Sequence, residues 1–222
     1  MQSIPLIDIS VPMTESLPVW PGDPPMQVER VLDVCCGDDA TVSRWTIGAH
    51  TGTHVDAPSH FIKGGKTLAE IPLHEWCGPC RVVEIRDRAL ITIADVMHLA
   101  WDGVTKVFFK TDNSLLIEDK PWYERPFNPQ FSALSVDAAQ YLLQQGITLI
   151  GIDYLSVEAY DSEGAPVHHT LLGHDVRIVE GLNLTQVEAG DYQLWCFPIH
   201  MAHTNGGDGA LARVALQAIP EQ

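Results

Sequence analysis

The sequence predicts a strand-rich α/β protein with a mixed sheet. Short runs of β-branched and aromatic residues, each bounded by Pro, Gly or Asp, recur along the chain, which is typical of strands. Helix signals are confined to two segments. The sequence contains no internal repeat, low-complexity tract or linker-like segment, so we expect residues 1–222 to form a single domain.

The predicted strands are short and follow one another along most of the chain. The first three, at residues 4–11, 26–32 and 42–47, are expected to belong to an antiparallel or mixed sheet. Their β-branched and aromatic content supports the prediction, as it does for the later strands. The later predicted strands are residues 81–85, 104–110, 147–153, 177–179, 192–198 and 212–219.

The two predicted helices each begin after a residue that favours helix N-termini. Residues 93–100 follow the N-cap candidate Thr92, and residues 136–145 follow Ser135. Gly146 stands at the position where a glycine commonly ends a helix. The apolar residues of the second helix share one face, so this helix is expected to pack on a sheet.

The composition is that of a globular protein. Hydrophobic residues make up 45% of the 222 residues and charged residues 19%, which supplies the apolar side chains that a packed core needs. The formal net charge is −16, and the sequence contains no run of Lys or Arg. Such a chain is repelled by nucleic acid and by anionic lipid surfaces. We therefore expect neither as a partner.

No segment predicts export or membrane insertion. The longest apolar runs, such as residues 147–152, are far shorter than the roughly 20 residues of a spanning helix. The first residues lack the basic start and apolar core of a secretory signal. Five cysteines, an odd number, fit reduced thiols better than a disulfide framework. We expect a cytoplasmic protein.

Three of the ten histidines and one carboxylate fall within the segment HTGTHVDAPSH. They are His50, His54, Asp56 and His60. Thr, Gly and Val are poor helix formers and Pro58 would break the next turn, so extended or looped backbone is expected. In extended backbone the side chains at even positions project to one side. The segment therefore predicts three imidazoles and one carboxylate on one side of the chain.

Such a group of side chains indicates a metal site. Neutral imidazole and carboxylate suit Zn²⁺ or another first-row divalent ion such as Mn²⁺. A site with few protein ligands leaves room for water, which is the arrangement of catalytic metal sites. The alternative is that these histidines are hydrogen-bonded structural residues in a turn rich in Gly and Pro. The density of ligand-type residues favours the metal.

Several segments, taken in order, resemble the cyclase-like family of metal hydrolases, whose members include bacterial kynurenine formamidase and isatin hydrolase. They are DISVPMTESLPVWPGD near the start, HTGTHVDAPSHF, FKTDNS at 109–114, residues 133–158, and HHTLLGHDVRIVEGLNL at 168–184. The resemblance covers most of the chain. It implies a swivelling β/β/α fold and assembly as a homo-oligomer such as a dimer or tetramer.

The resemblance also implies roles for the clustered residues. In the family, the residues that match His50, His54 and Asp56 bind a first metal, and the carboxylate bridges to a second metal where two are bound. His60 matches a residue that is either a ligand of the second metal or a proton-transfer group. These roles are expected here.

The segment near residue 168 matches the remaining ligands of the family. A His and a Glu twelve residues later correspond to His168 and Glu180. Two adjacent histidines in a strand point to opposite faces, so only one of His168 and His169 should reach the metals. The spacing to Glu180 favours His168. Trp20, in the segment VWPGD, is expected in a surface loop where its ring can bind an aromatic substrate.

The implied function is hydrolysis of a small aryl formamide such as N-formylkynurenine by a metal-activated water. One or two Zn²⁺ ions per subunit are expected, with Mn²⁺ as the alternative ion. A bound cation lowers the pKa of its water and polarises a carbonyl, which meets both needs of amide hydrolysis. A cyclic amide such as isatin, or a lactone, is the rival substrate. A metal-binding module without turnover is a further alternative.

The segment WCGPC at residues 76–80 indicates a competing function, because it matches the active-site sequence of thioredoxins. In that chemistry a helix begins at the first cysteine and lowers the pKa of its thiol. The residues after Cys80 read instead as a strand. Disulfide exchange through Cys77 and Cys80 is therefore the weaker hypothesis.

The remaining histidines carry less information. His74, His98 and His174 have no partner pattern and are expected at the surface. Relatives commonly end with a segment of the type Gly-Asp-Gly-Ala-Pro-Ala-Arg, whereas this chain has GDGALAR at 207–213. His200 and His203 precede that segment, and either line the pocket or are simply exposed.

Overall fold

The computed structural model describes residues 5–202 and 207–219, and its main feature is one large sheet. The strands of this sheet are β1 (Leu6–Asp8), β4 (His54–Asp56), β5 (Gly78–Glu84), β7 (Lys106–Lys110), β9 (Leu149–Ile152), β10 (Arg177–Glu180), β11 (Gly190–Pro198) and β12 (Gly209–Ala218). Their order is β1-β12-β11-β5-β7-β9-β10-β4, and β12 also pairs with β4. The sheet therefore closes on itself.

Closure depends on the length of β12. Its first residues, 209–211, pair with β4, and its last residues, 215–217, pair with β1 on the same side. The other side of β12 pairs with β11 along residues 212–218. Strands β5, β7, β9 and β10 run parallel, and the remaining pairs are antiparallel. The mixed sheet predicted from the sequence is confirmed.

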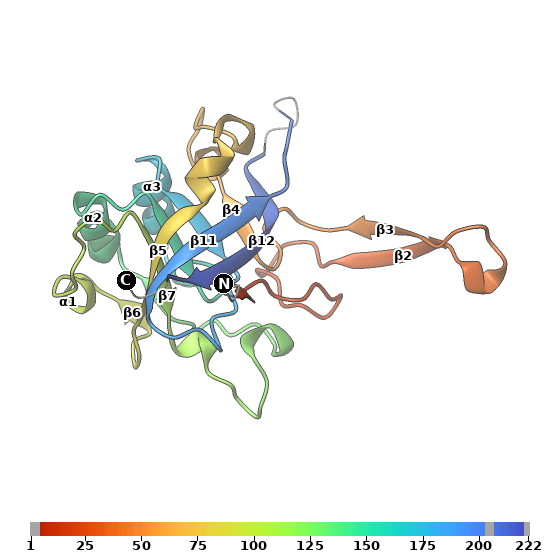
Figure 1. Ribbon diagram of the computed structural model, residues 1–222, viewed down its shortest axis with the longest axis horizontal. Helices are drawn as coiled ribbons and strands as arrows, with labels where there is room; N and C mark the ends of the chain where they lie inside the picture. Colours follow the sequence, from red (N-terminus) through yellow and green to blue (C-terminus); the bar gives the residue numbers. More distant parts are fainter. Residues whose placement is uncertain (1–4, 203–206, 220–222) are drawn as a thin grey trace.

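The helices cover one face of this sheet. They are α1 (Ile93–Val96), α2 (Val136–Gln144) and α3 (Pro166–Leu172), and they gather on the side of the body away from the hairpin described below (Figure 1). Ser135 caps α2, because its side chain accepts a hydrogen bond from the N–H of Ala138. Within the described part of the chain, no helix has the length and apolar character needed to cross a bilayer.

Side-chain alternation along the strands produces two apolar cores. On β7, Phe108 points into the core enclosed by the closed sheet, whereas Val107 and Phe109 point toward the helices. All three are fully buried. Because neighbouring side chains of a strand face opposite sides, a continuous apolar run such as this one is expected where both faces are covered.

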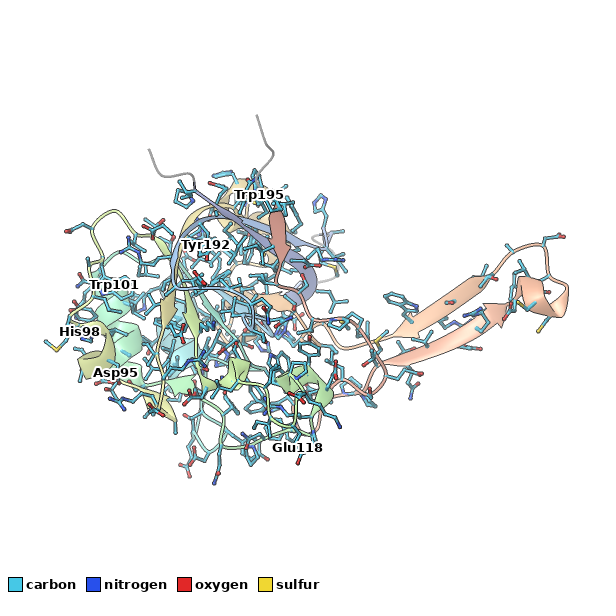
Figure 2. The ribbon with its side chains drawn as sticks, turned by 60° about the horizontal axis from the view of Figure 1, so that its bottom comes forward. Asp95, His98, Trp101, Glu118, Tyr192 and Trp195 are labelled. Atoms are coloured by element: carbon cyan, nitrogen blue, oxygen red, sulfur yellow. The ribbon has the colours of Figure 1, made fainter. Side chains whose placement is uncertain are left out.

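A β-hairpin projects far from the body, and we call residues 26–47 the arm (Figure 1). It consists of β2 (Gln27–Leu32) and β3 (Val42–Thr46), which pair only with each other among the described strands. Every residue of both strands is exposed, including Trp45 at 59%. Figure 2 shows these side chains standing in open space beside the two strands.

Short elements complete the structure. The strands β6 (Leu90–Ile91) and β8 (Ala133–Leu134) form a small parallel pair. Single turns of 3₁₀ helix occur at η1 (Val34–Cys36), η2 (Pro58–His60), η3 (Leu68–Glu70), η4 (Leu73–Trp76), η5 (Asp112–Ser114) and η6 (Trp122–Glu124).

The predicted strands are found within one to three residues of their expected ends, and both predicted helices are present. The first helix is shorter than predicted and ends at Val96. The sequence does not predict helix α3, because its HH pair and the Leu residues after it fit a helix and a strand equally well. The predicted strand at 81–85 begins earlier, at Gly78, where the strand pairs with β11.

Candidate metal centre

The centre is built around β4, the three-residue strand between β10 and β12. His54 and Asp56 project from the same side of β4, and Val55 points into the core of the closed sheet. All three side chains are buried. This is the alternation expected from the sequence, and it places an imidazole and a carboxylate side by side.

Extended backbone is limited to residues 54–56, so the expectation of extended or looped chain holds with loops on both sides. His50 lies in a turn before β4, and His60 is the last residue of the 3₁₀ turn η2 after it. Both rings nevertheless reach the same place. They stack with ring centroids 3.8 Å apart and planes inclined by 18°, and His50 and His54 have centroids 5.2 Å apart.

A second segment brings two further side chains to Asp56. Helix α3 carries His168, and β10 ends at Glu180. His168 Nε2 lies 3.7 Å from Asp56 Oδ2 and 3.4 Å from Glu180 Oε1. Glu180 is the register partner of His54 in the antiparallel pair of β10 with β4, and its Oε2 lies 3.3 Å from His54 Nε2.

The histidine pair lies in a helix and not in a strand, which corrects the assumption made for it from the sequence. Pro166 occupies the first turn of α3, where a missing N–H costs nothing. Adjacent helical residues point about 100° apart, so again only one of the pair reaches the centre. His168 is buried there, and His169 is exposed.

The donor atoms at the centre fit a divalent cation. Among the described residues, His54 Nε2 and Asp56 Oδ2 are buried side-chain atoms without a hydrogen-bond partner. Buried polar atoms are rarely left unpaired, since desolvation without a partner is costly. Imidazole nitrogens and carboxylate oxygens are the ligands that Zn²⁺ and similar ions take. These unpaired atoms indicate where an ion would sit.

Two sets of ligand atoms share Asp56. In each set the donor atoms lie within 4.8 Å of one another: His50, His54 and Asp56 form one, and Asp56, His168 and Glu180 form the other. A carboxylate that belongs to both sets stands where a bridging ligand would. The two sets of donor atoms could therefore hold one ion or two.

Asp208 also belongs to the centre, and the sequence analysis did not select it. Its Oδ2 lies 3.0 Å from His50 Nε2 and 3.9 Å from His60 Nδ1, and the three residues form a further set of possible ligands. The sequence feature that could have identified Asp208 is its position in the Gly-Asp-Gly segment that leads into β12. Gly209 follows it and lies directly against the His50 ring, which leaves no space for a side chain there.

The surroundings of His50 and His60 shift the pKa values of these two histidines in opposite directions. Burial lowers the pKa of His50, but hydrogen bonds to Asp56 and Asp208 outweigh burial and raise that pKa to about 9. The pKa of His60 is lowered by burial and by the neighbouring His50 and His168 rings, despite attraction from the carboxylates. His60 is thus neutral near pH 7, in contrast to His50.

In the second ligand set, the pKa values of His168 and Glu180 are shifted in opposite directions. Burial lowers the pKa of His168, but Glu158, Glu180 and Asp56 outweigh it and raise that pKa to about 10. Burial raises the pKa of Glu180, yet the close imidazoles of His168 and His54 hold it well below its ordinary value. Glu180 is therefore charged, as a carboxylate ligand of a cation must be.

A cavity of about 340 Å³ opens onto these residues. Its lining includes His50, His54, His60, His168 and Glu180. Apolar and aromatic side chains also line it, among them Trp20, Phe61, Leu155, Ala159 and Tyr160, together with the polar residues Asp23, Ser156, Glu158 and Ser162. Trp20 makes edge-to-face contact with Tyr160, at 5.4 Å between ring centroids. The volume and lining suit a small ligand with one ring.

Comparisons with known proteins agree with this geometry. A family model described as "Putative cyclase" matches residues 7–159. The chain belongs to the cyclase family. A kynurenine formamidase from Maricaulis maris (strain MCS10) is 35% identical over 214 residues, which is 96% of this chain and 98% of that protein. The resemblance drawn from the sequence is confirmed.

Solved structures show the same cyclase fold. A potential metal-dependent hydrolase with cyclase activity superposes with a TM-score of 0.80 and 34% identity, over 98% of this chain and all of that one. Isatin hydrolase A from Labrenzia aggregata gives a TM-score of 0.75 at 21% identity, over 97% of this chain and 94% of that one. The second likeness concerns the fold alone. The predicted fold class is confirmed.

The thioredoxin-like segment does not have the structure that redox chemistry needs. Cys77 follows the 3₁₀ turn η4 and is followed by the strand β5, as predicted, although this strand begins at Gly78 and not at residue 81. Cys80 is buried, and burial raises the pKa of its thiol far above the ordinary value. A buried, protonated thiol is a poor nucleophile. In this cyclase-family protein the segment serves as a turn into a strand.

The remaining histidine expectations are resolved in part. His200 is exposed and lines a different cavity, together with Leu73 and Met201, so it does not reach the centre. His203 lies outside the described residues. His98 is exposed on the α1 side of the body, as expected (Figure 2).

Proposed function

We propose that this protein is a metal-dependent hydrolase that cleaves the C–N bond of a small aryl formamide such as N-formylkynurenine. One observation carries the proposal: the unpaired donor atoms of His54 and Asp56 belong to a centre whose other residues line an aromatic cavity, in a chain that is 35% identical to a kynurenine formamidase. A cation site next to an aromatic wall suits an aryl amide.

We assign the ligands in two groups. His50, His54 and Asp56 hold a first ion, and Asp56, His168 and Glu180 hold a second where two are bound. Zn²⁺ is the proposed ion and Mn²⁺ the alternative, since both accept this donor set. A divalent cation at this place would polarise the carbonyl of the formamide and lower the pKa of a water molecule.

The other side chains would bind the substrate and move a proton. His60 lines the cavity and has a lowered pKa, so its imidazole is neutral near pH 7. It would accept a proton from the attacking water and donate it to the leaving amine. Its alternative role is that of a ligand, because it shares a set with His50 and Asp208. Trp20 stands in the aromatic wall and contacts the ring of the substrate.

The experiment is a substrate panel on metal-replete protein. The protein is stripped with a chelator and reloaded with Zn²⁺ or Mn²⁺, and hydrolysis of N-formylkynurenine, formanilide, isatin and a lactone is measured. The proposal expects metal-dependent cleavage with the highest kcat/KM for the aryl formamides. A higher kcat/KM for isatin or for the lactone would show that the substrate is a cyclic amide or a lactone and not an aryl formamide. Binding of metal with no turnover on the panel would leave only a metal-binding module.

We further propose that the protein is a homo-oligomer, a dimer or tetramer, as members of the family are. The arm supports this proposal, because an isolated two-stranded hairpin is marginally stable and this one exposes Val31, Val34 and Trp45. Light scattering on the purified protein gives the subunit number. A monomer at micromolar concentration would contradict the proposal.

A further inference from the structure

Glu158 is a buried carboxylate beside His168, and it also lines the cavity. It lies between β9 and α3, and only 6% of it is exposed. It belongs to neither of the two proposed ligand sets. A buried carboxylate is costly unless it is fully paired, so its partners show what holds it in place.

The partners of Glu158 come mainly from the start of α3. Its Oε2 accepts hydrogen bonds from the backbone N–H groups of Val167, at 2.8 Å, and His168, at 3.1 Å. The same oxygen lies 3.4 Å from His168 Nδ1. Its Oε1 accepts a hydrogen bond from Ser162 Oγ at 2.7 Å. One carboxylate thus fixes both the backbone and the ring of His168.

The start of α3 explains why a carboxylate is placed there. The N-cap residue Ala165 has a left-handed conformation, with φ at 47°, and provides no side-chain cap. Pro166 has no N–H, so the first free N–H groups belong to the next two residues. Glu158 satisfies both and places its charge at the positive end of the helix.

The opposite edge of the His168 ring faces the ligand sets. Its Nε2 points toward Asp56 and Glu180, at the distances given above. Phe61 stacks on the ring, with centroids 4.4 Å apart and planes inclined by 26°. An acceptor at Nδ1 would keep the proton on that nitrogen when an ion takes the place of the proton at Nε2. The surroundings of the ring thus fix its tilt and its position.

His54 shows a weaker version of the same arrangement. Its Nδ1 lies 2.9 Å from the carbonyl oxygen of Gly52, while its Nε2 faces the centre. A neutral carbonyl orients a ring, whereas a carboxylate also makes the ring a stronger electron donor. The hydrogen-bond acceptor at Nδ1 of His168 is therefore more basic than the one at Nδ1 of His54.

We propose that Glu158 is a positioning residue of the metal centre, which holds His168 through Nδ1 so that Nε2 is presented to the ion. This inference rests on the proposed function only in that an ion binds at the centre. Glu158 lines the cavity but belongs to neither ligand set, so we expect it to act on the ion through His168. Partners of this kind typically contribute a factor of about 10 to 100 in metal affinity.

The test measures Zn²⁺ affinity by competition with a chromophoric chelator, without substrate. The variant E158Q keeps an oxygen that can cap α3 and removes the charge behind the ring. We expect it to keep its fold by circular dichroism and to bind Zn²⁺ about 10- to 100-fold more weakly than the wild type. The matched control is E163Q, which removes the same charge from an exposed position nearby and should leave the affinity unchanged.

A double variant separates positioning from a purely structural role. If Glu158 acts through His168, then adding E158Q to H168A should cause no further loss of affinity. An equal loss in both backgrounds, or wild-type affinity in E158Q, overturns the inference. If E158Q does not fold, E158D replaces it, because the shorter side chain keeps the charge and withdraws it from Nδ1. Wild-type protein that binds no Zn²⁺ would refute the proposed function instead.

Discussion

His54 and Glu180 are register partners across β4 and β10, and their Nε2 and Oε2 atoms lie 3.3 Å apart. The pairing joins two segments that are more than 120 residues apart in the sequence. Each residue belongs to a different proposed ligand set, and Asp56 belongs to both. The backbone pairing of two strands thus sets the distance between the two groups of ligands.

Removing His54 should abolish metal binding and activity together. The variant H54A deletes a buried imidazole with an unpaired Nε2, and a ligand lost from the ion should cost more than the roughly 10- to 100-fold typical of an outer partner. Metal content after dialysis and hydrolysis of an aryl formamide are measured on the same sample. Metal-dependent hydrolysis at wild-type rate in H54A would refute the site assignment.

Removing His60 should affect turnover more than metal content. We expect H60A to keep most of its metal and to lose about 10²- to 10⁴-fold in kcat, the range typical of a general acid or base. The control is H98A, because His98 is an exposed histidine far from the cavity. A loss of metal equal to that of H54A would make His60 a ligand and not a proton carrier.

The metal-stripped protein should lose stability as the pH rises above neutral. His50 and His168 have pKa values of about 9 and about 10 in the folded protein, against about 6.5 when unfolded. Raised values of this kind stabilise the fold fully below pH 6.5, and this contribution is lost as the pH rises through the folded values.

The expected size is large enough to measure. For His50, a rise from 6.5 to about 9 corresponds to on the order of 3 kcal/mol. The Tm of stripped protein is compared between pH 6.5 and pH 10, and Zn²⁺-loaded protein is the reference, since bound metal requires the neutral imidazoles. A stripped protein whose Tm rises over this range would contradict the assigned hydrogen bonds.

Glycine at position 209 should be required for the site and not only for the strand. A Cβ in G209A would overlap the His50 ring, so the ring must move away from Asp56 and Asp208. We expect weaker metal binding in G209A with the fold retained. The comparison is A210G, the next residue of β12, where affinity should stay near the wild-type value.

The cysteine hypothesis has its own direct test. The variant C77S removes the thiol that disulfide exchange would need, and the hydrolase proposal expects nearly unchanged kcat/KM for the formamide. Insulin reduction with dithiothreitol measures the competing activity. Disulfide exchange by the wild type that C77S abolishes would establish a redox function after all.

The sequence was informative where chemistry is local. Alternation along β4 accounts for the shared side of His54 and Asp56, whereas His50 and His60 reach the same place from turns on either side of the strand. Boundaries of buried strands such as β7 were also readable, because an apolar run faces both cores.

Other parts of the centre depend on contacts that no local pattern contains. Asp208 reaches His50 only because β12 closes the sheet against β4. Glu158 reaches His168 only because α3 begins with a left-handed residue and a proline. The seven residues of α3 are too few to show a helical period, so the sequence does not distinguish a helix from a strand for the HH pair.

The arm leaves the body just after Trp20 and Asp23 and re-enters it just before His50, and all three residues line the cavity. Residues at both ends of the arm are therefore part of the cavity lining. A partner that binds the tip of the arm would immobilise the aromatic residue Trp20 and the proposed ligand His50 together.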